Sequence, residues 1–420
     1  MKLMFYVIAL TFTALAQAQV WPESLTLRVQ EENVQFRFLP QATGAPVYIH
    51  PWLGTKALQV GTRVLVKHEK ALKLANLRHH LIVSSAVVFE LEAYYWSVME
   101  TQSPLASLAL VQQLQSLPGI VMAEPDLLQI RLGTQGGETG RLPMPPPKPV
   151  RQQLSIEQWP ATPGAEVTLA VIDSAFGLAD PALQPFLPKL HYDIDQRRPL
   201  PLEPSEIAVN GYDSFHGDAT LATLWSRHPD TQGLAFAADA VLLRRDTNWT
   251  SDILVALQLA YLSQADLILA AWTLPLTQQA LSDALTFVAE NGRQGKGTLL
   301  IAAAGNFREN LNQSFSLAAQ PQVLTVNAES QGTVWPVIGE PIATQVPVPY
   351  LTFSQETGRY SLTFSNTSAA ATAVAGVLAA VLSEQPALTA ADLHRLVRQY
   401  SQPVFDAQGL MQHFQRSAQH

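Results

Sequence analysis

Four short, uninterrupted apolar runs are the feature that most limits the fold of this chain. The runs are residues 167–172, 241–243, 267–270 and 298–302. An apolar run without alternation is typical of a strand buried on both faces, as in a parallel sheet. Helical spacing lies between the runs, over residues 252–263 and 277–291. Alternating strands and helices predict a parallel sheet flanked by helices, so we expect residues 151–420 to form one α/β unit.

Residues 19–132 have a different pattern, which predicts a small α+β domain. Strand patterns occupy residues 62–67, 87–92, 95–98 and 120–126, the last as a short strand and turn. Helical spacing over residues 105–117 follows Ser103-Pro104, a typical start signal. The next segment, residues 133–150, is rich in glycine and proline, which is typical of an exposed linker open to proteolysis.

The N-terminus has the pattern of a secretory signal peptide. Lys2 precedes an apolar run over residues 3–15, and the small-residue site Ala16-Gln17-Ala18 follows. We therefore expect residues 1–18 to be removed on export to a periplasm or to the medium, with a buried N-terminal helix as the alternative. A later apolar run, residues 369–382, has 14 residues, where a bilayer needs about 20. It predicts a buried helix and no membrane span after signal cleavage.

Composition excludes several classes of function. Hydrophobic residues make up 47% of the 420 residues and charged residues only 14%, which permits a large core and argues against a disordered chain. The formal net charge of −8 gives no basic face, so no nucleic acid is expected as a partner. Because the chain has no cysteine, disulfides, a thiol nucleophile and a cysteine zinc site are excluded.

Four polar residues stand where a parallel sheet would place its site. Asp173 and Asn306 each follow one of the apolar runs, His216 opens a helical stretch, and Ser368 precedes the apolar run near the C-terminus. Sites of open parallel sheets form beyond the C-terminal ends of the strands. Each residue also has an ordinary interpretation as a turn or helix-start residue, and Ser368 in particular as an N-cap.

The segments around these residues resemble the subtilase family of serine proteases. Val-Ile-Asp-Ser-Ala-Phe-Gly at 171–177, with Asp-Pro-Ala-Leu at 180–183, resembles V-I-D-T/S-G-V/I and H-P-x-L. His-Gly-Asp-Ala-Thr-Leu-Ala from His216 resembles H-G-T-x-V-A-G, and the segment from Gly233 resembles G-V-A-P-x-A. Ala-Ala-Ala-Gly-Asn ending at Asn306 resembles A-A-G-N. Asn-Thr-Ser-Ala-Ala-Ala-Thr from Asn366, followed by Val-Ala-Gly, resembles G-T-S-M-A-x-P-x-V-A-G.

The resemblance implies a subtilisin-like fold and a set of roles. Ser368 would be the nucleophile, His216 the general base, Asp173 its orienting partner and Asn306 the oxyanion-hole donor. Residues 114–126 resemble the end of a subtilase propeptide, which implies that the first domain assists folding and inhibits the enzyme as an intramolecular partner. The other partner would be a peptide or protein substrate.

Several residues depart from the family pattern. Asn366, Ala369 and Thr372 stand where the family has Gly, Met and Pro. Asp218 stands where the family has Thr after His-Gly. Its carboxylate would either raise the pKa of the His216 imidazole or act as a favourable residue at a helix N-terminus.

The substrate-binding strand also departs from the family's S-x-G. Ala271 and Thr273 occupy the Ser and Gly positions, and bulk in place of glycine narrows a cleft where a peptide backbone must approach. Trp272 between them either shapes the specificity pocket or is a core aromatic.

Two functions are consistent with these residues: an exported serine endopeptidase, or a subtilase-like binding or scaffold protein with weak or no activity. No cofactor is expected for the chemistry. Subtilases often bind structural calcium, and Asp193, Asp195 and Glu203 are candidate oxygen ligands, but their spacing does not match a calcium loop.

Overall fold

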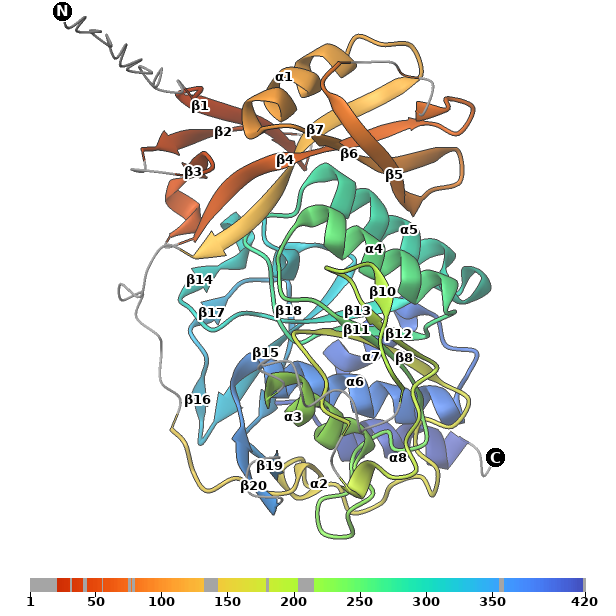
Figure 1. Cartoon of the computed structure of the whole chain (residues 1–420). Helices are drawn as coiled ribbons and strands as arrows, with labels where there is room; N and C mark the ends of the chain where they lie inside the picture. The colour runs from red at the N-terminus through yellow and green to blue at the C-terminus, as the bar shows by residue number, and fades with distance from the viewer. Residues whose placement is uncertain are drawn as a thin grey trace, which may run out of the picture.

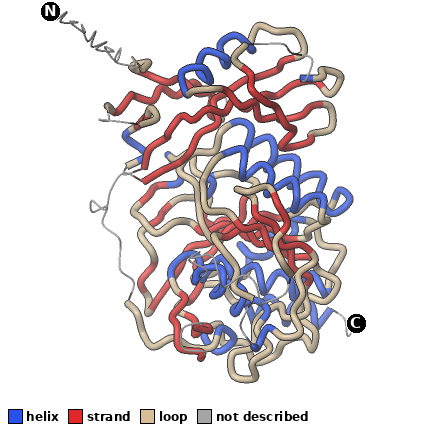
Figure 2. The backbone as a smooth tube through the Cα atoms, viewed as in Figure 1, coloured by secondary structure: helices blue, strands red, loops and turns tan. Residues whose placement is uncertain are grey.

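The computed structural model describes residues 21–417, apart from 31, 41–43, 55, 75–76, 78–79, 132–142, 179–180, 203–214 and 355–358. Within these residues the chain forms two units, each with its own large sheet (Figure 1, Figure 2). The predicted signal peptide, residues 1–18, lies outside the described residues, as does most of the predicted linker at residues 133–150.

An antiparallel sheet carrying one helix builds the N-terminal unit. The strands are β1 (Ser24–Val29), β2 (Glu32–Leu39), β3 (Val47–Ile49), β4 (Lys56–Glu69), β5 (Ile82–Glu90), β6 (Tyr94–Thr101) and β7 (Ile120–Arg131). They run in the order β1-β2-β3-β4-β6-β5, and β7 pairs with β4. Helix α1 (Pro104–Leu114) begins as predicted, because the Ser103 hydroxyl accepts a hydrogen bond from the N–H of Ala106 at 3.2 Å.

Strand β7 is longer than its sequence pattern indicated. The pattern predicted a short strand and turn over residues 120–126, whereas β7 continues to Arg131. Its partner β4 is 14 residues long and pairs with it antiparallel along most of its length. Residues 127–131 are part of the strand because they pair with the backbone of β4. This pairing with a distant segment cannot be predicted from the local periodicity of the sequence.

A mostly parallel sheet forms the centre of the second unit, in the order β10-β9-β11-β8-β12-β13-β15-β16, with β18 pairing with β15. Its strands are β8 (Thr168–Asp173), β9 (Leu190–Asp193), β10 (Arg198–Pro199), β11 (Asp239–Arg244), β12 (Leu267–Ala270), β13 (Leu299–Ala303), β15 (Val323–Ser330), β16 (Thr333–Val334) and β18 (Ile342–Pro347). All four apolar runs are strands of this sheet, and β8, β11, β12 and β13 pair in parallel. The expected α/β fold is therefore confirmed.

Helices cover both faces of this sheet, as the uninterrupted apolar runs predicted (Figure 1). They are α2 (Val150–Gln153), α3 (Phe215–Trp225), α4 (Thr250–Leu262), α5 (Gln279–Gly295), α6 (Asn366–Glu384), α7 (Ala390–Gln399) and α8 (Ala407–Ser417). In β8, Leu169 and Val171 belong to the apolar cluster that contains α6, whereas Ala170 and Ile172 belong to the cluster that contains α4 and α5. The alternate side chains of one strand thus enter two separate cores.

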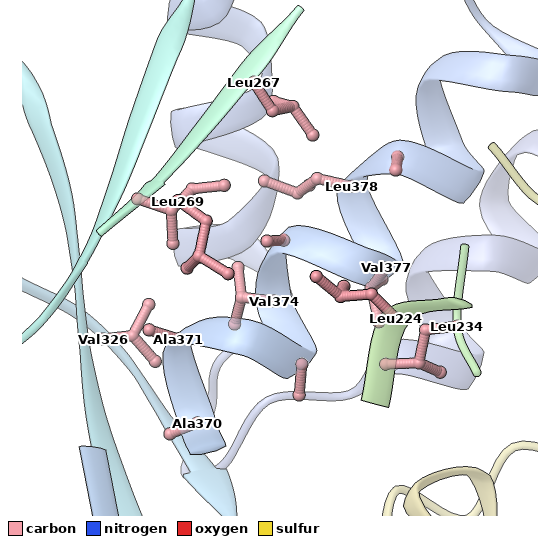
Figure 3. Packing of buried hydrophobic residues seen from close by; sticks show 14 of the residues in the cluster. Leu224, Leu234, Leu267, Leu269, Val326, Ala370, Ala371, Val374, Val377 and Leu378 are labelled. Carbon is pink, nitrogen blue, oxygen red and sulfur yellow. The ribbon is translucent and has the colours of Figure 1, made fainter. Parts of the chain in front are cut away.

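Helix α6 is the central element of the larger core. Its Val374, Val377 and Leu378 lie among leucines and valines of β12, β15, α3 and the loop before β11 (Figure 3). The helix has 19 residues, five more than the apolar run suggested, because it starts at Asn366 and ends at Glu384. It is long and apolar enough to cross a membrane, but 89% of its apolar window is buried within the fold. That burial is the pattern of a core helix.

The two units meet at the N-termini of α4 and α5. Asp126 of β7 accepts a hydrogen bond from the Ser251 N–H at 3.0 Å, and Glu124 accepts one from the Ala280 N–H at 3.1 Å. Apolar side chains of β4, β5 and β6 also join the cluster beneath α4 and α5. Two acidic side chains of one strand therefore supply acceptors for free N–H groups at the starts of two helices.

Candidate active site

Asp173 and His216 form a direct hydrogen-bonded pair. Asp173 is the last residue of β8, and His216 is the second residue of α3. The imidazole Nδ1 lies 2.8 Å from Oδ1 and 2.9 Å from Oδ2 of Asp173. The Asp173 side chain is 3% exposed, whereas the His216 side chain is 36% exposed. A buried carboxylate on Nδ1 fixes the imidazole so that Nε2 is directed away from Asp173.

Two further donors hold the Asp173 carboxylate. The Ser174 N–H donates to Oδ1 at 2.7 Å, and the Thr220 hydroxyl donates to Oδ2 at 3.3 Å. Thr220 also bonds the His216 carbonyl at 3.1 Å, one helical turn earlier in α3. The carboxylate has several partners, which is the condition for keeping such a group buried.

Close packing brings the loop after β8 onto the start of α3. A Cβ at Gly217 would lie 1.7 Å from the carbonyl oxygen of Ala175, so only glycine permits this approach. Beside it, the Asp218 carboxylate accepts a hydrogen bond from the Gly177 N–H at 2.5 Å. Asp218 lies in the first turn of α3, and its carboxylate joins this helix to the loop that carries Asp173.

Ser368 lies in the first turn of α6. The N-cap interpretation of Ser368 is wrong, because the helix starts at Asn366 and Ser365 occupies the N-cap position. The Ser368 hydroxyl donates to the carbonyl oxygen of Ala271 at 2.7 Å. Ala271 directly follows β12. The location of the Ser368 hydroxyl is therefore fixed by its place in α6 and by its hydrogen bond to the end of β12.

Asn366 explains how the family's glycine can be replaced. Its φ is 65°, in the left-handed region that glycine adopts freely. Asparagine is among the few other residues that tolerate this region. The chain can therefore make the same turn before Ser368 without glycine.

Ala369 and Thr372, which stand where the family has methionine and proline, both fit within helix α6. The Thr372 hydroxyl donates to the Ser368 carbonyl at 2.9 Å, one turn back, and Ala369 is fully buried. Such a bond satisfies a hydroxyl within the helix. Both departures from the family pattern are thus compatible with a regular α6.

Asn306 is oriented by the residue before Ser368. Its Oδ1 accepts from the Thr367 hydroxyl at 2.8 Å and from the Thr367 N–H at 3.3 Å. Because the amide oxygen is occupied in this way, the Nδ2 group is the end that is presented as a donor. The preceding Gly305 has φ of 105°, a conformation that L side chains rarely adopt.

The two halves of the site are connected through Phe364. Its ring meets the His216 ring edge to face, with centroids 5.7 Å apart and planes at 89°. Phe364 ends β20 (Arg359–Phe364), which pairs with β19 (Tyr350–Ser354) and leads directly into α6. The segment that carries Ser368 thus also packs against the imidazole.

The three candidate substrate-binding residues have different surroundings. Ala271 is buried and bonds Ser368. Thr273 Cγ2 lies 3.4 Å from where a Cβ of Gly305 would be, so this side chain borders the loop of Asn306. The Trp272 indole N–H donates to the Ile172 carbonyl at 2.6 Å and packs, half-buried, against the core beneath α4 and α5. Trp272 is therefore anchored to β8 next to Asp173.

Sequence reasoning missed Arg245, which links these parts. Its guanidinium lies over the Trp272 ring at 3.8 Å, and its backbone N–H donates to the Asp173 carbonyl at 2.8 Å. Burial lowers the pKa of Arg245 to about 10, and the charge of Asp173 opposes that shift. Two successive arginines at the end of a buried strand, Arg244 and Arg245, are the sequence signal that could have identified it. Thr367 and Phe364 lie one and four residues before Ser368 and carried no separate sequence signal.

The candidate calcium ligands have other partners. Arg244 lies 2.8 Å from Asp193 and 3.5 Å from Asp195, so a guanidinium stands among these carboxylates. Glu203, like Asp180 of the first motif, is outside the described residues. Among the residues that the structure describes, no group of three or more His, Asp or Glu side chains is arranged to hold a metal ion.

Comparison with known proteins identifies the family of the chain. A model of the subtilase family matches residues 164–414, more than half of the chain. Two relatives are proprotein convertase subtilisin/kexin type 9 of Mus musculus, 35% identical over 113 residues, and that of Rattus norvegicus, 36% identical over 107 residues. These matches cover 25% and 24% of this chain, but only 16% and 15% of the relatives' own length.

A solved structure shows the same fold. Fervidolysin from Fervidobacterium pennivorans, a keratinolytic enzyme related to subtilisin, superposes with a TM-score of 0.55 and 16% identity. The match covers 80% of this chain and 57% of fervidolysin. The chain belongs to the subtilase family, and the subtilisin-like fold expected from its sequence is confirmed.

Proposed function

We propose that the protein is a serine endopeptidase that hydrolyses peptide bonds through Asp173, His216 and Ser368. The observation that carries the proposal is the hydrogen bond of His216 Nδ1 to both oxygens of the buried Asp173, at 2.8 and 2.9 Å. Membership of a family of serine proteases supports it. Asn306, oriented by Thr367 beside Ser368, supplies the oxyanion-hole donor.

In the proposed reaction, Ser368 Oγ attacks the scissile carbonyl carbon and its proton passes to His216 Nε2. The carbonyl oxygen becomes an oxyanion, which accepts hydrogen bonds from Asn306 Nδ2 and the Ser368 N–H. His216 then protonates the leaving amine as the C–N bond breaks. A water molecule, deprotonated by the same imidazole, hydrolyses the acyl-enzyme and restores the serine.

The hydroxyl must change partner for this reaction. Ser368 Oγ donates to Ala271, and the attack requires its proton to be directed at His216 instead. Catalytic hydrogen bonds are often long or misaligned before substrate binds. A substrate backbone that docks along residues 271–273 would compete for the Ala271 carbonyl and release the hydroxyl.

The N-terminal unit would act as the propeptide, inhibiting the site and assisting folding, and cleavage would fall within residues 133–150. Its carboxylates at the starts of α4 and α5 support this role, because they complete helix ends of the second unit. The signal-peptide pattern of residues 1–18 supports export to a periplasm or the medium. Sequencing the N-terminus of the secreted protein tests both cleavages.

A fluorophosphonate probe tests the catalytic proposal, since it reacts only with an activated serine. We expect the full chain to react and to cut itself within residues 133–150, and Ser368→Ala to do neither. Ser383→Ala, a serine on the same helix whose hydroxyl bonds Ala380, is the matched control and keeps both activities. A folded wild-type chain that does neither would support the alternative, a binding or scaffold protein without activity.

A further inference from the structure

Gln129 of β7 is enclosed between two segments of the second unit, Leu276 on one side and Asn248–Trp249 on the other, which form the two walls of a groove. Gln129 is 3% exposed, and its side-chain amide makes two hydrogen bonds to a single residue, Leu276. Its Nε2 donates to the Leu276 carbonyl at 2.7 Å, and its Oε1 accepts from the Leu276 N–H at 2.9 Å. A primary carboxamide is the side-chain group that matches both a donor and an acceptor of one backbone residue.

The opposite wall of the groove holds the backbone of the same residue. The Gln129 N–H donates to the Asn248 carbonyl, and Asn248 Nδ2 donates to the Gln129 carbonyl, both at 3.3 Å. Leu128 forms an antiparallel bridge with Trp249. The chain segment in the groove is thus extended. Its backbone binds Asn248 on one side, and the Gln129 side chain binds Leu276 on the other.

Both walls are linked to the candidate catalytic residues, one through Arg245 and the other through a short chain segment. Asn248 accepts a hydrogen bond from the Arg245 side chain, and Arg245 bonds Asp173 through its backbone. Leu276 lies five residues after Ala271, whose carbonyl holds the Ser368 hydroxyl. Five extended residues span at most about 17 Å. The groove therefore lies within about five substrate residues of the nucleophile.

The strand in the groove also leads toward the oxyanion loop. Two residues after Gln129, Arg131 pairs with Lys56 of β4. The Lys56 ammonium lies 3.6 Å from Glu309, three residues after Asn306. The predicted cleavage segment starts directly beyond, at residue 133.

We propose that the groove between Asn248–Trp249 and Leu276 is a substrate subsite that selects a glutamine side chain ahead of the cleaved bond. Gln129 is then the chain's own occupant of the subsite, and glutamine-containing peptides are the preferred substrates. The assignment rests on the proposed peptidase function.

The selectivity follows from hydrogen bonding in a buried site. An ionised glutamate cannot donate to the Leu276 carbonyl, and leucine leaves both backbone groups of Leu276 unpaired. Asparagine is one methylene too short to reach them. Leaving a buried polar group unpaired costs enough to lower kcat/KM by about tenfold to a hundredfold.

Quenched fluorescent peptides with the sequence of residues 126–134, which hold no other glutamine, test the subsite, with Gln, Asn, Glu or Leu at the position of Gln129. The wild-type chain is first allowed to process itself and is titrated with the fluorophosphonate probe. We expect the glutamine peptide to have the highest kcat/KM, by tenfold or more. The variant Asn248→Ala removes a contact to the substrate backbone and one to Arg245, but none to the glutamine side chain. It should lower kcat/KM for all four peptides by a similar factor and leave their ratio unchanged.

The outcomes separate this assignment from the proposed function. A protein that does not react with the probe overturns the peptidase proposal itself. A probe-reactive protein that hydrolyses the four peptides equally, or hydrolyses none of them, overturns the subsite and leaves Gln129 as a structural contact between the two units.

Discussion

Three helices of the second unit begin in the same way but are completed differently. The N-cap residues of α4, α5 and α6 are Trp249, Gln278 and Ser365, and none makes a side-chain capping bond. At α4 and α5, Asp126 and Glu124 of the N-terminal unit accept the free N–H groups. At α6, Asn306 accepts from Thr367, and Ser368 lies in the first turn.

One physical property serves two purposes in these helices. A helix N-terminus presents free N–H groups that need acceptors. Where the acceptor is a fixed carboxyl group of the N-terminal unit, it joins the two units. Where it is the transient oxyanion of the proposed reaction, it lowers a barrier. The following predictions test this contrast, starting from the largest expected effect.

Glu124 should make the stability of the chain fall as pH rises. Burial, with smaller contributions from Asp283 and Asp126, raises its pKa to about 8, and only the Ala280 N–H and Gln278 oppose this. Lys67, which faces the same region, pairs with Asp283 at 2.7 Å. An acid with a raised pKa in the folded state contributes stability below its unfolded pKa and loses it as pH rises through the folded pKa.

Between about pH 4.5 and pH 8, the loss attributable to Glu124 should approach 1.4 kcal/mol per pH unit. Urea unfolding of the Ser368→Ala chain, with and without Glu124→Gln, measures it. The glutamine keeps an acceptor for Ala280 and cannot ionise, so the difference between the two chains should widen in its favour toward pH 9. Parallel pH profiles would contradict a neutral, buried Glu124.

Asn306→Ala should lower kcat by about 100- to 1000-fold with little change in KM, because the amide acts on the oxyanion only in the transition state. Steady-state hydrolysis of a peptide substrate measures this. Asn312→Ala, at an asparagine whose side chain bonds the Glu340 N–H outside the site, serves as the control. A loss of less than tenfold would remove Asn306 from the oxyanion hole.

Asp126→Ala should lower the free energy of unfolding by about 1–2 kcal/mol, since it removes the acceptor for the N–H and the hydroxyl of Ser251. Denaturant unfolding in the Ser368→Ala background measures the loss. Asp126→Asn retains an acceptor for the Ser251 N–H and should lose clearly less. Equal losses from both variants would show that charge, and not the hydrogen bond, completes α4.

Asn366→Gly should have the smallest effect, with kcat nearly unchanged and the free energy of unfolding altered by less than about 0.5 kcal/mol. Asn366→Ala should cost about 1 kcal/mol, because alanine is strained at a φ of 65°. Thermal unfolding compares the two. A glycine variant with much higher activity would mean that the asparagine had impaired the turn before Ser368.

Much of the fold could be read from the sequence, which also singled out four candidate site residues. The apolar runs of β8, β11, β12 and β13 could be recognised because a strand buried on both faces has consecutive apolar side chains. Asp173, His216, Asn306 and Ser368 were singled out by their places at strand and helix ends together with the resemblance of their segments to the subtilase family. The start of α1 was visible because its cap, Ser103, is local.

Contacts between distant segments were decided only by the tertiary structure. The bond of Asp218 to Gly177, the bond of Ser368 to Ala271 and the stacking of Arg245 on Trp272 each join residues that are far apart in the chain. So does the fit of Gln129 to Leu276. Periodicity and capping signals arise within a few residues of one another, whereas these partners depend on how the whole sheet and its helices pack. The sequence by itself determined which residues are available for the chemistry, and the packing decided how each of them is held.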